Sequence, residues 1–409
     1  MHRKIIHSDL NNFYASVECL KNPWLRSAPL AVAGDSEKRK GIILAKNIPA
    51  AAFGIKTGEP IWKARQKCPD LITVPPSFDD YIKISRRVRK IYEEYSGRVE
   101  AFGIDECWLD ISDITKDFEQ AKLIADDIRK RIQNEIGITA SCGVSFNKVF
   151  AKLASDIKKP DATTVIRPNN YKDIVWQLPA DAMLFVGRST KNAFSRLNIH
   201  TIGDIANTDV KSLEFIFGKN GIKMWNNANG VDEDAVIYAD ISYEVKSVGN
   251  SVTTAHDLVC DDDVKIVLFS LCETVSARMR KMGIICNTVQ LYVKDCELNS
   301  YQRQTKLNIP NRTVLSLFDN TYDMYLTHHT SGKPIRALGV RVSELSPDDD
   351  EQLSIDPETI KLYKCERLDL AADSIRERFG ESAIKRGILL TDSLLSLPIL
   401  EEKCSFSKI

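Results

Sequence analysis

The chain has 409 residues, of which 43% are hydrophobic and 27% are charged, and its 56 basic residues balance 56 acidic ones. This length and composition predict an ordinary soluble globular protein with about two to four domains. Because the net charge is zero, a surface that binds nucleic acid would have to be a local feature of the fold.

Three classes of protein are excluded or disfavoured by what the sequence lacks. No run of 18 apolar residues is present, which excludes a membrane span. The apolar run near the N-terminus is too short for a signal peptide. The ten cysteines form no C-x-x-C pair, so zinc binding is disfavoured, and we expect reduced thiols in a cytoplasmic protein.

The N-terminal residues predict a strand that ends at an acidic side chain. The strand begins at Ile5 and closes at Asp9, and Phe13, Val17 and Leu20 then recur at helical spacing. A carboxylate where a strand gives way to a helix is well placed to bind a metal ion. It is also well placed to cap the helix, so both interpretations stand.

The next predicted elements are a small hairpin and a basic helix. Two apolar runs at 29–34 and 41–45 flank a charged turn, and short helices follow up to residue 67. A phosphate-binding role for the turn competes with a solvated hairpin tip. A helix is predicted over 79–95, and its exposed side is strongly basic: Lys83, Arg86, Arg87, Arg89 and Lys90.

Two adjacent carboxylates, Asp105 and Glu106, fall where two short strands meet at a turn. Neighbouring residues of a strand point to opposite faces, so a turn or bulge must re-aim one of them if both serve one site. Their mutual repulsion is usually relieved by a hard divalent cation. A solvated acidic turn is the alternative interpretation.

The elements after the acidic turn complete a predicted α+β sandwich. They are a helix, a strand, a basic turn and a strand at residues 118–132, 138–145, 158–162 and 164–166. The order predicts one helical layer on an antiparallel sheet. A ferredoxin-like arrangement would place Asp9 on a strand adjacent to Asp105 and Glu106.

The second half of the chain predicts a helical segment, a linker and another α+β unit. Residues 171–235 are helical in pattern, with Gly-centred turns at 185–189 and 199–204 that could offer N–H groups to phosphates; a plain helical subdomain is the alternative. The α+β unit after the linker is close to neutral, which counts mildly against DNA binding. Its elements are a helix over 264–281 and strands over 287–293, 305–309 and 337–342. A final amphipathic helix uses Leu368, Leu370, Ala371, Ile375 and Phe379.

Several motifs, taken in order, resemble those of the Y-family translesion DNA polymerases of the polymerase IV type. They are Ser8–Glu18, Gly103–Asp110, Gly143–Lys152 with Lys158–Asp161, Val186–Thr190, Thr201–Asp204 and Lys246–Asn250. The resemblance covers residues 1 to about 345. It implies an α+β multidomain fold, a right-hand polymerase with a ferredoxin-like palm, small fingers, a helical thumb and an α+β little-finger domain. The implied boundaries are 1–20 and 78–166 for the palm, 21–77 for the fingers, 167–236 for the thumb, 237–243 for the linker, 244–345 for the little finger and 346–409 for the tail.

The resemblance implies a DNA-directed DNA polymerase that carries out template-directed, low-fidelity translesion synthesis in DNA repair. Asp9, Asp105 and Glu106 would be the catalytic ligands of two Mg²⁺ ions, joined by the main-chain carbonyl of Leu10. The implied partners are primer–template DNA and a deoxynucleoside triphosphate (dNTP). We expect a cytoplasmic monomer that does not associate with membranes.

The resemblance also implies nucleotide-binding and DNA-binding residues. The nucleotide-binding residues are Asn12, Phe13, Tyr14 and Lys159. Tyr14 occupies the position of a steric gate against the ribose 2′-hydroxyl, with core packing as the alternative, and Lys159 matches the lysine that meets the triphosphate. The DNA-binding residues are Gly187, Arg188, Gly203, Gly249, Ser251 and Thr253.

Two positions depart from the family pattern. The family usually has a Tyr and an Arg that hydrogen-bond the triphosphate, where this chain has Ile48 and Ala51. Losing such bonds, at about 1.5–3 kcal/mol each, predicts weaker nucleotide binding unless Lys46 or Lys56 compensates. The alternatives are therefore a catalytically weakened member that mainly binds primer–template DNA or repair complexes, and a nucleotidyl cyclase, which shares the palm-type fold.

The tail contains a candidate clamp-binding peptide. Gln352, Leu353 and Ile355 resemble the Gln-Leu-x-Leu-Phe peptide by which such polymerases hold the sliding clamp. That peptide works by placing apolar anchors in a pocket. The terminal aromatic residue is missing here, so a solvated linker is the alternative.

Overall fold

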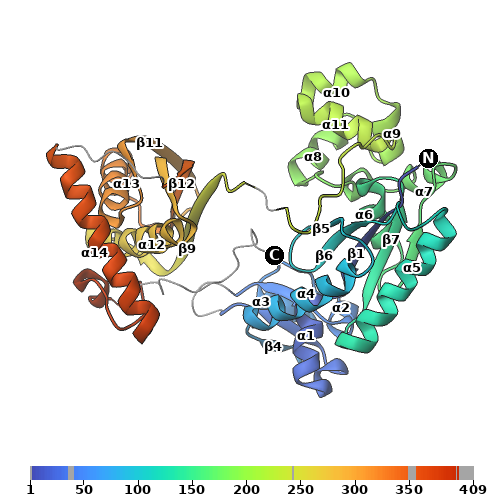
Figure 1. Ribbon diagram of the computed structural model, residues 1–409, viewed down its shortest axis with the longest axis horizontal. Coiled ribbons are helices and arrows are strands. Elements are labelled where there is room, and N and C mark those ends of the chain that lie inside the picture. The colour runs from blue at the N-terminus through green and yellow to red at the C-terminus, as the bar shows by residue number, and fades with distance from the viewer. Residues whose placement is uncertain (1, 36–40, 242–243, 349–355, 393, 396–409) are drawn as a thin grey trace. The chain divides into compact units, whose positions relative to one another are not determined.

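The computed structural model describes residues 2–35, 41–241, 244–348, 356–392 and 394–395. The described residues form two compact units, one that ends at residue 241 and one that begins at residue 244 (Figure 1). The prediction of an α+β multidomain protein is confirmed.

The first unit is built around a five-stranded sheet with the order β5-β6-β1-β7-β8. These strands span Val99–Ala101, Glu106–Asp110, Ile5–Leu10, Ala140–Ser145 and Thr163–Val165, respectively. β1 is antiparallel to both neighbours, and Asp9 lies directly opposite Glu106 in the register of β1 and β6. The predicted neighbourhood of the carboxylate strands is confirmed.

Helices cover both faces of this sheet, so the prediction of a single helical layer on an antiparallel sheet is wrong. Every residue of β1 and β7 is buried, which requires cover on both sides. On one face lie α1 (Phe13–Lys21), α4 (Phe78–Glu93) and α5 (Phe118–Arg131), which share a core with Ile6 and Cys107. The other face carries α6 (Lys148–Ile157), and the last pair of strands, β7 and β8, is parallel.

A glycine lets α6 (Lys148–Ile157) lie against the sheet. A Cβ atom on Gly143 of β7 would stand 2.0 Å from the carbonyl oxygen of Ala151 and 2.4 Å from the amide nitrogen of Ser155. Only a residue without a side chain permits this approach. The contact brings the residues of α6 close to the carboxylates of β1 and β6.

A three-stranded sheet follows α1 in the chain. It is formed by β2 (Leu30–Ala33), β3 (Ile43–Lys46) and β4 (Ile72–Val74), with β2 and β3 antiparallel as the hairpin prediction requires. Short helices α2 (Ile48–Ala52) and α3 (Ile61–Lys67) pack beside it. This small layer supplies one wall of the pocket described below.

The segment after β8 is helical, as predicted. Its helices are α7 (Tyr171–Val175), α8 (Arg188–Arg196), α9 (Ile202–Asn207), α10 (Val210–Phe217) and α11 (Lys219–Ala228). The supposed second Gly-centred turn is instead the start of α9, where Thr201 and Asp204 form a capping box. Gly203 therefore lies inside a helix.

The second unit is a four-stranded antiparallel sheet with helices on one face. The order is β11-β10-β12-β9, and the strands span Ser300–Asn311, Ile284–Asp295, Ile335–Pro347 and Ser247–Leu258, respectively. Helices α12 (Asp261–Met282) and α13 (Val314–His328) cover the apolar face. The strands are longer than the sequence predicted, and α13 was not predicted at all.

The C-terminal helix α14 (Pro357–Phe379) forms where a helix was predicted, but its buried face is different. The apolar residues chosen for that face, including Leu368 and Phe379, are exposed, whereas Asp369 and Arg376 are buried. The reason is a network of ion pairs with α12 and with the segment around the short turn Gly387–Leu390. Its contacts are Arg376–Glu273 at 3.4 Å, Arg386–Glu273 at 2.9 Å, Arg386–Asp369 at 2.7 Å and Arg280–Asp373 at 2.6 Å.

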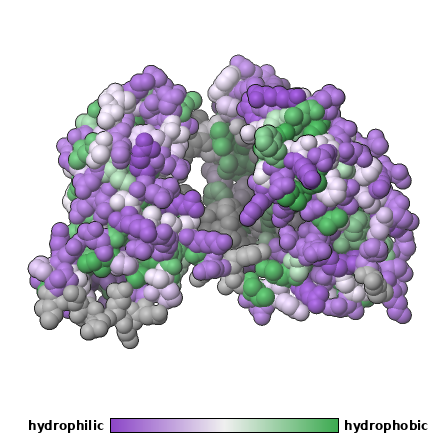
Figure 2. Space-filling model, turned by 90° about the horizontal axis from the view of Figure 1, so that it is seen from above, coloured by the Kyte–Doolittle hydropathy of each residue, from purple (hydrophilic) through white to green (hydrophobic). Residues whose placement is uncertain are grey.

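The visible surface of both units is mainly hydrophilic. On the face shown in Figure 2, hydrophilic residues predominate in both units and apolar residues form small, separate groups. Among the described helices, none is both long enough and apolar enough to cross a membrane.

Candidate active site and DNA-binding face

A pocket of about 390 Å³ lies in the first unit, between the carboxylate strands and β3. Its lining consists of Asp9, Leu10, Asn12, Phe13, Tyr14, Leu44, Ala45, Lys46, Thr57, Asp105, Glu106 and Lys159. All eight residues that the sequence assigned to metal and nucleotide binding are in this set. Residues more than 140 positions apart in the chain therefore meet at one cavity.

The local backbone explains how the carboxylates reach the same pocket. Asp9 lies on β1 opposite Glu106 on β6, whereas Asp105 lies in the turn just before β6. The carbonyl oxygen of Asp105 accepts a hydrogen bond from the amide of Leu10 at 3.0 Å, which ties the turn to β1. The turn thus re-aims one of the two adjacent carboxylates. Asp9 does not cap α1, because the N-cap is Asn12.

Two lysines neutralise part of the negative charge. Lys152 Nζ on α6 lies 3.0 Å from Asp9 Oδ2 and 3.0 Å from Glu106 Oε1, and Lys159 Nζ lies 2.6 Å from Asp9 Oδ2. Burial alone would lower the pKa of Lys152, but the charges of Asp9 and Glu106 outweigh it and raise the pKa. The sequence analysis missed Lys152, although it closes the third motif and follows Gly143 and the capping Asn147 of α6.

The two lysines do not fully neutralise the carboxylates, as Asp105 and Glu106 show. Burial and the charges of Asp9 and Glu106 raise the pKa of Asp105 to about 6. Glu106 Oε2 is buried and makes no hydrogen bond, although His7 Nε2 lies 3.3 Å away. Carboxylate oxygens are the ligands that Mg²⁺ prefers, and one of those at this site is buried without a partner.

The carboxylates are not pre-arranged around a common point. Within the described ranges, no three His, Cys, Asp or Glu side chains converge closely enough to hold a metal ion as they stand. Oxygens of Asp9 and Glu106 contact the ammonium groups of Lys152 and Lys159 instead. A cation that binds here must therefore take over contacts that the lysines now make.

Tyr14 packs against neighbouring rings and also lines the pocket, and its role as a steric gate stays a prediction. Its ring stacks on Tyr81, with 4.4 Å between the ring centroids and an interplanar angle of 9°, and meets the edge of Phe78. It is only half-buried and also lines the pocket. Packing therefore fixes the ring where it narrows the cavity.

The two departures from the family pattern lie outside the pocket. Ile48 and Ala51, at the start and near the end of α2, are exposed and do not line the cavity. Lys46 does line it, and its Nζ lies 3.5 Å from Thr57 Oγ1. Lys56 is exposed and is not among the lining residues. Of the two lysines considered as replacements, only Lys46 faces the cavity.

The two predicted phosphate-binding turns differ in whether their backbone N–H groups are exposed. Gly187 and Arg188 are exposed at the start of α8. Gly203 is buried, and its N–H donates to the carbonyl of Trp176 at 3.1 Å. A Cβ atom at this position would meet Trp176 at 3.0 Å, so the glycine serves close packing and its N–H is not free for a phosphate.

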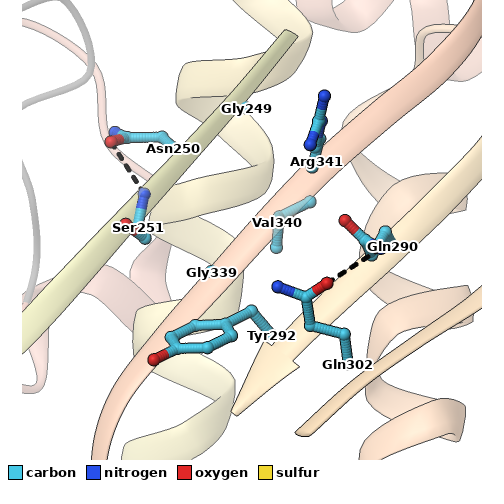
Figure 3. Close-up of a pocket in the computed structure, with 9 residues that line it drawn as sticks. All are labelled: Gly249, Asn250, Ser251, Gln290, Tyr292, Gln302, Gly339, Val340 and Arg341. Atoms are coloured by element: carbon cyan, nitrogen blue, oxygen red, sulfur yellow. Dashed lines mark hydrogen bonds between the residues drawn. The ribbon is translucent and has the colours of Figure 1, made fainter. Parts of the chain in front are cut away.

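The outer face of the second unit's sheet carries a shallow, open pocket (Figure 3). It is lined by Gly249, Asn250, Ser251, Gln290, Tyr292, Gln302, Gly339, Val340 and Arg341. Thr253 lies two residues beyond Ser251 on β9, and the antiparallel register places it on the same face. The sequence analysis named only the β9 residues, although strand alternation also points Gln290, Tyr292 and Arg341 to this side.

The candidate clamp-binding residues Gln352, Leu353 and Ile355 lie outside the described residues. Their role stays a prediction.

Comparisons with known proteins agree on one family. The impB/mucB/samB family matches residues 8–156, and the impB/mucB/samB family C-terminal domain matches residues 245–355. The chain is 47% identical to DNA polymerase IV of Acetivibrio thermocellus over 96% of this chain and 98% of that protein. It is 34% identical to DNA polymerase IV of Clostridium acetobutylicum, over 95% and 99%, and to DNA polymerase IV 1 of Bacillus subtilis, over 95% and 93%.

A solved structure supports the fold. A Y-family DNA polymerase chimera matches with a TM-score of 0.74 and 24% identity, over 83% of this chain and 98% of the chimera. The right-hand polymerase fold predicted from the motifs is therefore confirmed. The chain belongs to the Y-family of DNA polymerases and is a DNA-directed DNA polymerase of the DNA polymerase IV type.

Proposed function

We propose that the pocket between β1, β6 and β3 joins a dNTP to the 3′-hydroxyl of a primer on template DNA, in low-fidelity synthesis past lesions. The observation that carries the proposal is the meeting of Asp9, Asp105, Glu106 and Lys159 at one cavity. Family membership gives this arrangement its chemistry. It also counts against a nucleotidyl cyclase, and no comparison supports a member that only binds DNA.

A polymerase of this family depends on divalent metal ions, and the donors here fit Mg²⁺. Asp9, Asp105 and Glu106, with the carbonyl of Leu10, would hold two ions. When bound, the ions would activate the primer hydroxyl and neutralise charge on the triphosphate. The unpartnered Glu106 Oε2 and the raised pKa of Asp105 both support this assignment, because each reflects missing positive charge.

The chain's own residues would position the nucleotide. Tyr14, held by Tyr81, would exclude a ribose 2′-hydroxyl. Lys159, which lies 2.6 Å from Asp9, would neutralise charge on the triphosphate. Ile48 and Ala51 stand where the family has a Tyr and an Arg that bind the triphosphate. We infer that Lys46, on the β3 wall of the pocket, replaces part of the triphosphate binding that those two residues would provide.

The DNA itself would be held elsewhere. Gly187 and Arg188 could contact phosphates from the start of α8, and the polar outer face with Gly249, Ser251 and Thr253 could follow a DNA groove in the second unit. That face carries glutamine, serine and tyrosine side chains with one arginine in the pocket. A sliding-clamp contact through the tail and a monomeric state are part of the same proposal.

Primer extension with Mg²⁺ and the four dNTPs tests the proposal. We expect extension by the natural protein, none by Glu106→Gln, and normal extension by Glu93→Gln, which neutralises an exposed carboxylate at the end of α4. A titration of dNTP then measures KM, which we expect Lys46→Met to raise. Failure of the natural protein to extend any primer, despite binding it, would refute the catalytic assignment.

A further inference from the structure

Helix α4 (Figure 1) carries four exposed cations on its basic side, which form a stripe on the surface of the first unit. Lys83, Arg86, Arg87 and Lys90 are all exposed, and each lies three or four residues from two of the others. This spacing places them on one side of the helix, over about 10 Å of its length. Arg89 is separate, because it faces the other way and is half-buried beside Cys107.

The stripe has no counter-charges of its own. Among the described residues, Lys83, Arg86 and Lys90 make no ion pair or side-chain hydrogen bond, and Arg87 donates only to the carbonyl oxygen of Glu135. Asp80 pairs with Lys21, and Glu94 and Glu135 pair with Arg131. Asp79 and Glu93 lie about one helical turn before Lys83 and after Lys90, at the two ends of the stripe. Like charges at these spacings destabilise a helix by a few tenths of a kcal/mol per pair, so a bound polyanion would relieve a cost that the free protein bears.

The position of α4 excludes the catalytic carboxylates as the reason for this charge. α4 packs on the sheet face that bears Ile6 and Cys107, whereas Asp9 lies on the same face as Ile5, on the side of α6. The first turn of α4 nevertheless begins beside the pocket, because Phe78 contacts Tyr14. The stripe therefore starts near the edge of the cavity and leads away behind the sheet.

We propose that this stripe binds the phosphate backbone of the single-stranded template ahead of the primer terminus. The proposal rests on the proposed polymerase function, which supplies a polyanion: the part of the template strand that has not yet been copied and must lead into the pocket. The stripe itself contains no aromatic side chain, so it lacks the stacking platforms that grip bases. The contact is therefore with phosphates alone and independent of sequence.

The test compares DNA binding by three proteins on two primer–templates. The stripe variant combines Lys83→Gln, Arg86→Gln and Lys90→Gln, and keeps Arg87 because of its bond to the backbone. A matched control makes the same change in net charge at three cations that already pair with carboxylates, Lys122, Lys265 and Lys333. One substrate has a single templating nucleotide and the other has a long single-stranded template overhang.

The association constant K for DNA falls as salt rises. On the long overhang, we expect the slope of log K against log salt to be less steep in the stripe variant by about 2, because three single-strand phosphate contacts are lost. Over a fourfold rise in salt, the natural protein should then lose about 20-fold more affinity than the variant. The slope on the short overhang, and extension across its one templating nucleotide, should be unchanged. An equal slope in all three proteins, the same loss in the control, or the same loss on both overhangs would overturn the proposal. Extension on the short overhang is scored separately, so loss of the polymerase function would be visible on its own.

Discussion

Removing the charge of Lys152 tests how the carboxylate pocket is stabilised without metal. Its ammonium lies 3.0 Å from both Asp9 Oδ2 and Glu106 Oε1 and 3.4 Å from Asp156. In Lys152→Met, Glu106 Oε1 loses its counter-charge, whereas Asp9 keeps Lys159. Breaking a buried ion pair costs about 3–5 kcal/mol, and partial exposure with the surviving lysine lowers our expectation to about 2–4 kcal/mol.

Tryptophan fluorescence can report this loss from the first unit alone. All five tryptophans of the chain lie there: Trp24, Trp62, Trp108, Trp176 and Trp225. With a chelator present, we expect the midpoint of thermal unfolding of Lys152→Met to fall by about 4–16 °C. Millimolar Mg²⁺ should close at least half of the gap, because the metal ions replace the missing ammonium. An unchanged midpoint in chelator, or a gap that Mg²⁺ leaves intact, would refute this account of the pocket.

The pH dependence of the same deficit has a definite sign. The pKa of Asp105 is raised to about 6 in the folded protein, above its usual value, so its ionisation destabilises the metal-free fold above that pH. The penalty is full above about pH 6 and is lost progressively as the pH falls from 6 towards the ordinary pKa of 3.8. The raised pKa of Lys152 keeps it charged at neutral pH, and its charge lowers the pKa of Asp105. In Lys152→Met, Asp9 keeps Lys159, and protonation of Asp105 relieves more of the remaining repulsion. The deficit of Lys152→Met should therefore be smaller at pH 5 than at pH 8.

Three further changes test other parts of the structure. His7 is fully buried, and burial is the main reason that its pKa is lowered to about 3. Its neutral ring lies 3.3 Å from Glu106 Oε2 without a hydrogen bond. His7→Leu removes this polar neighbour and should reduce the thermal stabilisation by Mg²⁺, whereas His7→Gln, which keeps a polar N–H, should restore most of it. Tyr14→Ala should lower the preference for dNTPs over ribonucleotides in kcat/KM by about 10- to 100-fold, and an unchanged ratio would exclude the gate. Glu273→Gln should destabilise the second unit by about 2–4 kcal/mol and speed hydrogen exchange in α14, because Arg376 loses a buried partner; unaltered exchange would show that the ion pairs do not hold the helix.

The catalytic pocket could be predicted because its signals are local in the sequence. Asp9 lies near the end of a short strand, and Asp105 and Glu106 lie at the turn where β6 begins. The family motifs supplied the pairing of these segments, and the register of Asp9 with Glu106 confirms it. Lys159 and Tyr14 followed from the same motifs.

What could not be predicted depends on contacts between distant segments. Nothing local shows that α14 turns Asp369 and Arg376 inward, because their partners lie on α12 and beyond the helix. Periodicity therefore selected the exposed apolar residues for the core. The segment around Gly203 was predicted to be a turn because of its glycine. Only the close contact with Trp176 in the structure reveals that this glycine serves packing. The second helical layer was missed because alternation cannot identify a strand that is buried on both faces.

The central claim is that Asp9, Asp105 and Glu106 together hold two divalent cations in the presence of substrates. Electron paramagnetic resonance can count bound Mn²⁺, used in place of Mg²⁺, on the protein with primer–template DNA and a non-hydrolysable dNTP. We expect two ions per natural protein and fewer for Glu106→Gln at the same free Mn²⁺ concentration. The same number of ions in both proteins, or no ion in the natural complex, would contradict the account.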